Sequence, residues 1–327
     1  MYDIVTFGEA MIRLSPPHFQ RFEQAASFDV CAGGGELNVA VSASRLGLKA
    51  AWVSKLPDNP IGRLIRNKAR EAGVGTEHVV WSKEGRAGIY FLELGAAPRA
   101  SSVLYDRSNS SISLIKPREV EWNAVFEGVK VFHVSGITPA LSKSAAEVTF
   151  EALRAAKRKG AKVSYDLNYR AKLWTEAEAR ACQEPMMEFV DILISTEEDT
   201  NRVFRIAAPT YNEVAEILAR TFKFEVVAIT LRETPSVWKN LWTAIAYAGG
   251  KFYADKTYEV EIVDRIGSGD AFTAGFLAGY IEAGVERGVK LGNAVAALKH
   301  SVPGDLNVFT RDEVENLLKK GGLRISR

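Results

Sequence analysis

A strand, a glycine-rich turn and a helix follow one another between residues 257 and 283, and this succession constrains the fold of the 327-residue chain most strongly. Residues 257–263 alternate apolar and polar side chains, which predicts a strand, and residues 271–283 carry apolar side chains at helical spacing. Between them lies Gly267-Ser268-Gly269-Asp270. Glycines let backbone N–H groups approach a ligand closely, and a helix N-terminus adds unpaired donors, so the turn suits a phosphate or a transferring phosphoryl group.

Asp270 gives this turn a second possible role. A carboxylate in the first turn of a helix can simply complement the helix dipole, a contribution of about 0.3–1 kcal/mol. It can also accept the proton of an attacking hydroxyl group. The spacing of the glycines does not by itself separate these two interpretations.

Strands and helices alternate along most of the chain. Apolar runs predict strands over residues 3–8, 51–55, 78–82, 129–135, 161–166, 191–195 and 225–230, and helical spacing predicts helices over 36–46, 61–72, 142–159, 175–189 (broken at Pro185), 212–221, 287–299 and 311–320. Such alternation indicates an α/β fold, which we expect to be a three-layer, doubly wound, mostly parallel sheet.

Two segments interrupt this rhythm. Residues 11–17 with 28–32, and residues 87–94 with 101–107, read as short extended runs without intervening helices. We therefore expect a core made of residues 1–9, 33–86 and 108–327, and a discontinuous β-sheet lid made of residues 10–32 and 87–107.

Composition excludes several classes of function. The 42 basic and 40 acidic residues nearly balance, and no basic block is visible, which disfavours nucleic acid as a partner. No apolar stretch approaches the ~20 residues of a membrane span, and the four histidines lack metal-ligand spacing. The two cysteines share no motif, and the predicted strand at residues 3–8 occupies the place of a signal peptide. We therefore expect a cytoplasmic protein.

The run Asp264-Arg265-Ile266-Gly267-Ser268-Gly269-Asp270 resembles the signature of the ribokinase (PfkB-type) family of carbohydrate kinases. The resemblance implies that Asp270 is the catalytic base and that the amides of Gly267, Ser268 and Gly269 form the anion hole. Ser268 stands where the family usually has alanine. We expect Asp270 to keep an ordinary pKa, which is no obstacle because the proton leaves late in a loose transition state.

A second glycine turn, Gly33-Gly34-Gly35, opens the predicted helix at 36–46. Alone, it could be no more than a tight connection. The resemblance implies that Gly34 and Gly35 let the sugar approach the backbone and that Asn38 contacts its hydroxyl groups.

Three further motifs resemble the 2-keto-3-deoxygluconate kinase branch of that family: residues 88–93, 105–107 and 166–170. Two arginines on opposite walls suit a carboxylate, which arginine grips in bidentate fashion. The resemblance implies substrate contacts from Tyr90, Tyr105, Arg107 and Arg170, and from Asp305 in a Pro-Gly-Asp run. A solvated turn at 166–170 and a turn aspartate at 305 are the alternatives.

The resemblance also implies ATP and Mg²⁺ as cofactors. The residues of this chain that correspond, by the resemblance, to ATP-binding residues of the family are Asn168, Thr230, Arg232, Gly267, Gly269 and Asn293. Residues 234–240 depart from the usual pattern, which leaves the adenine contacts there open. Glu198 or Asp199 would organise Mg²⁺ through water, although Thr196 replaces the usual asparagine and an ordinary acidic first helical turn is the alternative. Whether a monovalent cation binds near Asp264 and the 301–305 loop stays open.

We therefore expect an ATP-dependent kinase that phosphorylates a primary hydroxyl of an acid sugar, 2-keto-3-deoxygluconate to its 6-phosphate or a close relative. A fructokinase-like enzyme for neutral sugars is one alternative, and a non-catalytic protein that responds to a sugar or nucleotide is another. A lid with exposed sheet edges also suggests a homodimer or higher homo-oligomer formed through the lid.

Overall fold

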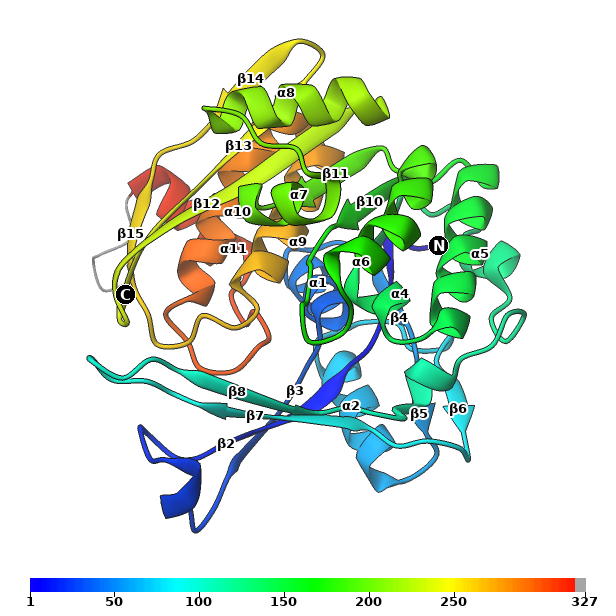
Figure 1. Ribbon diagram of the computed structural model, residues 1–327, viewed down its shortest axis with the longest axis vertical. Coiled ribbons are helices and arrows are strands. Elements are labelled where there is room, and N and C mark those ends of the chain that lie inside the picture. The colour runs from blue at the N-terminus through cyan, green and yellow to red at the C-terminus, as the bar shows by residue number, and fades with distance from the viewer. Residues whose placement is uncertain (321–327) are drawn as a thin grey trace.

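A mixed nine-stranded sheet forms the centre of the computed structural model, which describes residues 1–320 (Figure 1). Its order is β14-β13-β12-β11-β10-β9-β1-β4, with β15 paired to β13. The six strands from β12 to β4 run parallel, and β13 pairs antiparallel with β12, β14 and β15. The bounds are β1 Ile4–Phe7, β4 Ala50–Val53, β9 Val131–Ser135, β10 Lys162–Asp166, β11 Ile192–Ser195, β12 Val226–Ser236, β13 Lys239–Ala248, β14 Lys251–Ala254 and β15 Tyr258–Glu261.

Helices cover both faces of this sheet. Successive side chains of a strand point to opposite faces, so the strands of this sheet contribute to two buried clusters. Ile4 and Ile192 belong to one buried cluster, and their neighbours Val5 and Leu193 belong to the other. The first cluster includes residues of α1 Gly35–Arg45, α2 Pro60–Glu71, α9 Ser268–Ala283 and α10 Val285–Lys299, with α11 Arg311–Lys320 packed on α10. The second includes residues of α3 Trp122–Val125, α5 Lys143–Arg158, α6 Glu176–Gln183, α7 Glu197–Phe204 and α8 Tyr211–Phe222. The three-layer α/β arrangement expected from the sequence is confirmed.

Shorter elements connect these layers. They are α4 Ile137–Ala140 and three 3₁₀ segments, Phe22–Gln24, Ser111–Leu114 and Glu184–Phe189. The strands β5 Lys55–Pro57 and β6 Val80–Ser82 pair in a separate two-stranded parallel sheet. Its residue Trp81 is exposed, which suits a strand outside the central sheet, since central parallel strands are covered on both faces.

A small four-stranded sheet crosses one end of the core, where Figure 1 shows it below the central sheet. Its order is β3-β2-β7-β8, and its strands are β2 Met11–Ser15, β3 Asp29–Gly33, β7 Gly88–Glu93 and β8 Ser102–Asp106. We call this sheet the lid. Its strands come from two distant stretches of the chain.

Helix α9 begins three residues earlier than its apolar spacing predicted. Gly267 caps it in the left-handed conformation, with φ of 81°, and Ser268 is its first residue. The whole Ser268-Gly269-Asp270 run therefore lies in the first helical turn, where N–H groups have no partner within the helix. None of the helices within residues 1–320 is both long and apolar enough to span a membrane.

Candidate active site

A cleft of about 460 Å³ lies between the lid and the edge of the core where the parallel strands end. Ligands of open α/β sheets bind at this edge, outside the carboxyl ends of the strands. The predicted residues that line it are Gly34, Gly35, Asn38, Tyr90, Tyr105, Arg107, Asn168, Arg170, Glu198, Asp199, Thr230, Arg232, Gly267, Ser268, Gly269, Asp270 and Asp305. Asn293 lies outside this lining, on α10. Residues far apart in the sequence thus meet in one cleft, and their functional roles stay predictions.

Asp270 lies on the floor of the cleft, next to α1. Its Oδ2 accepts a hydrogen bond of 2.7 Å from Asn38 Nδ2. Burial raises the pKa of Asp270 to about 7, and the nearby Glu36 and Asp305 carboxylates add to that rise, while Asn38 and Arg170 oppose it. The ordinary pKa expected from the sequence is therefore wrong. The physical reason is the tertiary surroundings of the carboxyl group.

The glycine turn at the start of α9 is packed on one side and open on the other. A Cβ on Gly267 would lie 2.1 Å from the carbonyl oxygen of Asp305, so only glycine fits there. A Cβ on Gly269 would meet nothing within 4 Å. The Ser268 hydroxyl donates to the carbonyl oxygen of Arg265, 2.9 Å away. The Ser268 N–H also donates to the Arg265 carbonyl oxygen, at 3.3 Å, so the N–H groups of Gly269 and Asp270 are the ones in this first turn that can approach an anion in the cleft.

The second glycine turn supports Asn38. A Cβ on Gly34 would lie 2.0 Å from the carbonyl oxygen of Glu9, so this turn packs directly against the chain that follows β1. Gly34 N–H donates to Asn38 Oδ1 at 3.3 Å, which turns the Asn38 amide nitrogen toward Asp270. A Cβ on Gly35 would lie 3.7 Å from Asp270 Oδ1. Both glycine turns thus converge on the same carboxylate.

Arg107, which directly follows the lid strand β8, forms an ion pair with Glu9, which follows β1 of the core. The arginine also lies over the ring of Tyr105, at 5.6 Å from the ring centroid. Arg107 Nε and Glu9 Oε1 are buried without hydrogen-bond partners within the described residues. A buried polar atom without a partner is costly, so both atoms are candidates for contact with a polar ligand.

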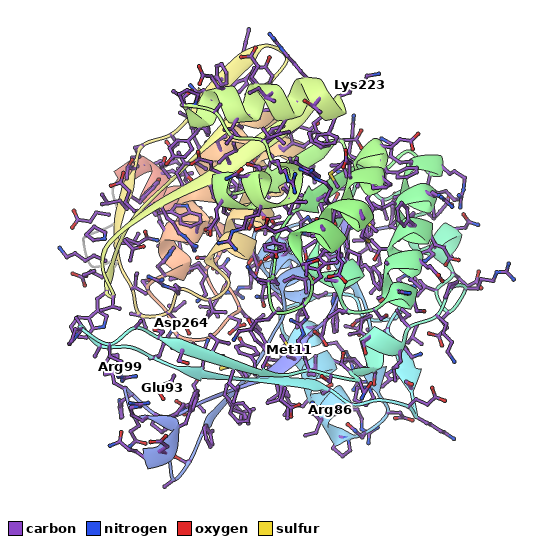
Figure 2. The ribbon with its side chains drawn as sticks, in the orientation of Figure 1. Met11, Arg86, Glu93, Arg99, Lys223 and Asp264 are labelled. Atoms are coloured by element: carbon purple, nitrogen blue, oxygen red, sulfur yellow. The ribbon has the colours of Figure 1, made fainter. Side chains whose placement is uncertain are left out.

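Asp305 belongs to a buried network that joins the lid to the core. Arg13 of β2 contacts Asp264 at 2.6 Å and Asp305 at 2.9 Å, and the Tyr90 hydroxyl donates to the second Asp305 oxygen. Burial raises the pKa of Asp305, while Arg13 and Tyr90 oppose that rise. Figure 2 labels Asp264 in the core just above the lid and Met11 on the lid strand beneath. Asp305 therefore holds the lid as well as lining the cleft.

The predicted metal-organising residues differ in their surroundings. Glu198 is exposed and forms an ion pair of 2.6 Å with Arg202. Asp199 is partly buried, and burial raises its pKa. Burial also raises the pKa of Asp166, and the nearby Asp199 carboxylate raises it further. Thr196 caps α7 by accepting the Asp199 N–H. Within residues 1–320, no group of three or more histidine, cysteine, aspartate or glutamate side chains could hold a metal alone.

Three arginines also line the cleft: Arg170, Arg232 and Arg265. None of them belongs to the ion pairs formed among residues 1–320, although Arg170 lies near enough to Asp166, Asp199 and Asp270 to oppose the rise of their pKa values. Burial lowers the pKa of Arg265, and Arg232 nearby lowers it further. Asn293 is fully buried, and both of its side-chain polar atoms lack partners within the described part of the chain.

The sequence interpretation missed Glu9, Arg13, Glu36 and Arg265 as residues of this region. Glu36 is buried and accepts hydrogen bonds from Ser135 and Thr138, which place its charge near Asp270. Glu9 follows directly after β1, and a polar residue at a strand end is a usable signal. Arg13 between the apolar residues Ile12 and Leu14 of a strand is another signal, since a buried arginine needs a partner.

Comparison with known proteins agrees with the geometry of the cleft. The model of the pfkB family carbohydrate kinases matches residues 1–310. A 2-dehydro-3-deoxygalactonokinase of Haloferax volcanii is 43% identical over 328 residues, which cover 99% of this chain and 99% of the relative. A 5-dehydro-2-deoxygluconokinase of Halalkalibacterium halodurans is 30% identical over 98% of this chain and 95% of its own. The crystal structure of a 2-dehydro-3-deoxygluconokinase from Thermotoga maritima superposes with a TM-score of 0.94 at 42% identity, covering 96% of this chain and 97% of the other.

Proposed function

Because this chain belongs to the pfkB family of carbohydrate kinases, we propose that it transfers a phosphoryl group from ATP to the primary hydroxyl of a 2-keto-3-deoxy sugar acid. The proposed acceptor is 2-keto-3-deoxygluconate or its galacto epimer, and the product is the 6-phosphate. The observation that carries the proposal is the meeting of Asp270 and its glycine turn with Arg107 and Arg170 in one cleft. The two 2-dehydro-3-deoxy sugar-acid kinases above, each more than 40% identical to this chain, favour an acid substrate.

The residues on the nucleotide side suit ATP. The unpaired guanidinium groups of Arg232 and Arg265 line the cleft and suit phosphate oxygens. The unpartnered Asn293 amide is fully buried outside the cleft lining, so it would meet an adenine ring only if the side chains covering it moved. Thr230 and Asn168 would contact the nucleotide at the cleft wall. When bound, ATP supplies the γ-phosphoryl group, and Mg²⁺ offsets part of its charge. Asp199 and Asp166 would hold Mg²⁺ through water, since this ion keeps several waters and needs few protein carboxylates.

Asp270 acts on the acceptor hydroxyl in this proposal. Its carboxylate orients the hydroxyl and takes up its proton, and a pKa of about 7 suits a base at neutral pH. The N–H groups of Gly267 and Gly269 hold the negative charge that develops beside them, and that of Ser268 joins them if it leaves the Arg265 carbonyl oxygen. Loss of one such donor typically lowers the rate ~10²–10³-fold, and loss of a base lowers it ~10²–10⁴-fold.

Arg107 and Arg170 bind the carboxylate of the sugar acid in this proposal. The buried Arg107 Nε has no partner within the described residues, so the arginine still offers a donor although Glu9 neutralises part of its charge. The Glu9 pair also favours a second candidate, a kinase for neutral sugars, because a guanidinium already paired with a carboxylate binds another one less strongly.

A coupled assay of ADP release over acid and neutral sugars distinguishes these candidates. We expect turnover with 2-keto-3-deoxy sugar acids and a KM for them that rises at least ~10-fold in Arg107→Ala, since a charged hydrogen bond contributes about 1.5–3 kcal/mol. The KM for any neutral sugar should change little. Arg99→Ala is the matched control, because Arg99 also belongs to the lid side but pairs with Glu93 outside the cleft lining (Figure 2). Equal effects on acid and neutral sugars would refute the carboxylate contact.

A further inference from the structure

Lys299, the last residue of α10, is fully buried in the core beneath the glycine turn. Within residues 1–320, its Nζ donates to two backbone carbonyl oxygens, that of Asp264 at 3.2 Å and that of Val302 at 3.5 Å, and to no carboxylate. A buried lysine is rare unless its charge is compensated. Burial lowers the pKa of Lys299, and the nearby carboxylates of Asp264 and Asp305 oppose that shift.

The two carbonyl groups belong to the segments that position the glycine turn. Asp264 opens the segment leading into this turn, and its N–H group donates to the carbonyl oxygen of His300 at 3.1 Å. Gly304 N–H donates to Asp264 Oδ2 at 3.0 Å. The turn itself rests on this loop, because a Cβ on Gly267 would meet the carbonyl oxygen of Asp305. A group that draws the carbonyls of Asp264 and Val302 together therefore influences where the turn lies.

Two buried cations and two buried anions lie close together here. Arg13 and Lys299 are the cations, Asp264 and Asp305 are the anions, and all four are at most 3% exposed. The Asp270 carboxylate also raises the pKa of Lys299, against the lowering by burial. Lys299 also lies at the C-terminal end of α10, where the helix dipole favours a positive charge. A further cation beside Lys299 would add a third positive charge next to Arg13 and Lys299, which is unfavourable in a medium that solvates ions poorly.

We propose that the Lys299 ammonium takes the place of a monovalent cation beneath the anion-binding turn, so that this kinase does not require potassium. Backbone carbonyl oxygens are the ligands that replace the hydration shell of K⁺ in proteins, and here an ammonium group contacts two of them. The sequence had left open a monovalent cation at this place, near Asp264 and the 301–305 loop. Lys299 is thus a positioning residue, since it reaches the turn through Asp264 and Val302.

Lys299→Ala tests this assignment, because it removes the ammonium and leaves room for an ion. Turnover and melting temperature are measured in potassium, ammonium and tetramethylammonium chloride at equal ionic strength. We expect the unaltered enzyme to change less than about twofold among these salts. In tetramethylammonium, Lys299→Ala should lose ~10²-fold in kcat, the typical effect of displacing a catalytic group by about 1 Å. Potassium or ammonium should restore at least ~10-fold of that loss and raise the melting temperature of the variant, as expected for an ion that binds the folded state.

Two variants serve as controls. Lys299→Met fills the space without charge, so its low activity should not respond to potassium. Lys55→Ala removes another buried lysine, which contacts the Leu114 carbonyl and Glu119 outside the cleft lining, and potassium should not affect its turnover. The turnover measurements rest on the proposed kinase function, whereas the melting temperatures are measured without substrate. A wrong substrate assignment would therefore leave the thermal response intact.

Several results would overturn the proposal. Activation of the unaltered enzyme by potassium of more than ~10-fold is one, since removal of a needed charge has at least that effect. A second is a Lys299→Ala variant with full activity in tetramethylammonium, and a third is a loss of activity that neither cation reverses. Should Lys299→Ala fail to fold, the potassium response of the unaltered enzyme still decides, because independence supports the proposal and strong activation refutes it.

Discussion

Replacing Asn38 with leucine tests the role of Asp270 without removing its carboxylate. Asn38 Nδ2 donates to Asp270 Oδ2 at 2.7 Å, and this hydrogen bond opposes the burial that raises the pKa of Asp270 to about 7. Leucine has the same branched outline and the same number of side-chain heavy atoms as asparagine but donates no hydrogen bond, and its apolar side chain excludes a replacing water. The ionised form of Asp270 should therefore become less stable.

The size of the shift follows from the strength of the lost bond. A hydrogen bond to a charged group contributes about 1.5–3 kcal/mol, and one pKa unit corresponds to about 1.4 kcal/mol. We therefore expect the pKa of Asp270 to rise by about one unit or somewhat more. Because a proton acceptor works only when ionised, activity is present above its pKa and is lost as the pH falls through it. At pH 7 a rise of one unit reduces the ionised fraction about fivefold, and well above pH 8 the difference disappears.

The assay is the pH profile of kcat/KM, which reports the pKa values of the free enzyme. The acid limb should have its midpoint near pH 7 in the unaltered enzyme and about one unit higher in Asn38→Leu. Loss of a sugar contact would lower the whole profile without moving that midpoint. Ser268→Ala is the control, because its hydroxyl bonds to Arg265 and not to Asp270. An unchanged or lowered midpoint in Asn38→Leu would refute the assignment of Asp270 as the proton acceptor.

Two further substitutions test neighbouring parts of the site. Asp270→Asn should fold but lose ~10²–10⁴-fold in kcat. Because folding raises the pKa of Asp270, its ionised form destabilises the protein fully above pH 7, and this effect fades as the pH falls toward the ordinary carboxyl pKa. Asp270→Asn should therefore melt at a higher temperature than the unaltered protein at pH 8 and at nearly the same temperature at pH 4, and a lower melting temperature at pH 8 would contradict this. Arg13→Met removes the cation that contacts Asp264 and Asp305 directly, so urea titration should show a loss of about 3–5 kcal/mol in unfolding free energy. A loss below about 1 kcal/mol would mean that the network is solvated or that Lys299 compensates both charges.

Local patterns in the sequence predicted the large elements well. Helix α5 was expected over residues 142–159 and spans Lys143–Arg158, because its apolar face repeats with the helical period. The start of α9 was placed three residues late, at 271. Glycine has low helix propensity, so the Gly267-Ser268-Gly269 run did not predict that the helix begins at Ser268.

Pairs of charged residues were harder to predict. Arg107 was expected to be free for a substrate, yet it pairs with Glu9, 98 residues away in the chain. Asp305 was expected to contact substrate, and it also binds Arg13, 292 residues away. Neither partner follows from spacing, because the lid and the core meet only in the folded chain.

The sequence by itself determined the class of fold, the glycine turn with its carboxylate, and the family resemblance. These rest on periodicity and on short motifs, in which neighbouring residues act together. Only the tertiary structure decided the pKa of Asp270, the partners of Arg107 and Asp305, and the burial of Lys299 beneath the turn. Burial and charge act through space, so these properties depend on which distant side chains the fold brings within a few ångströms of one another.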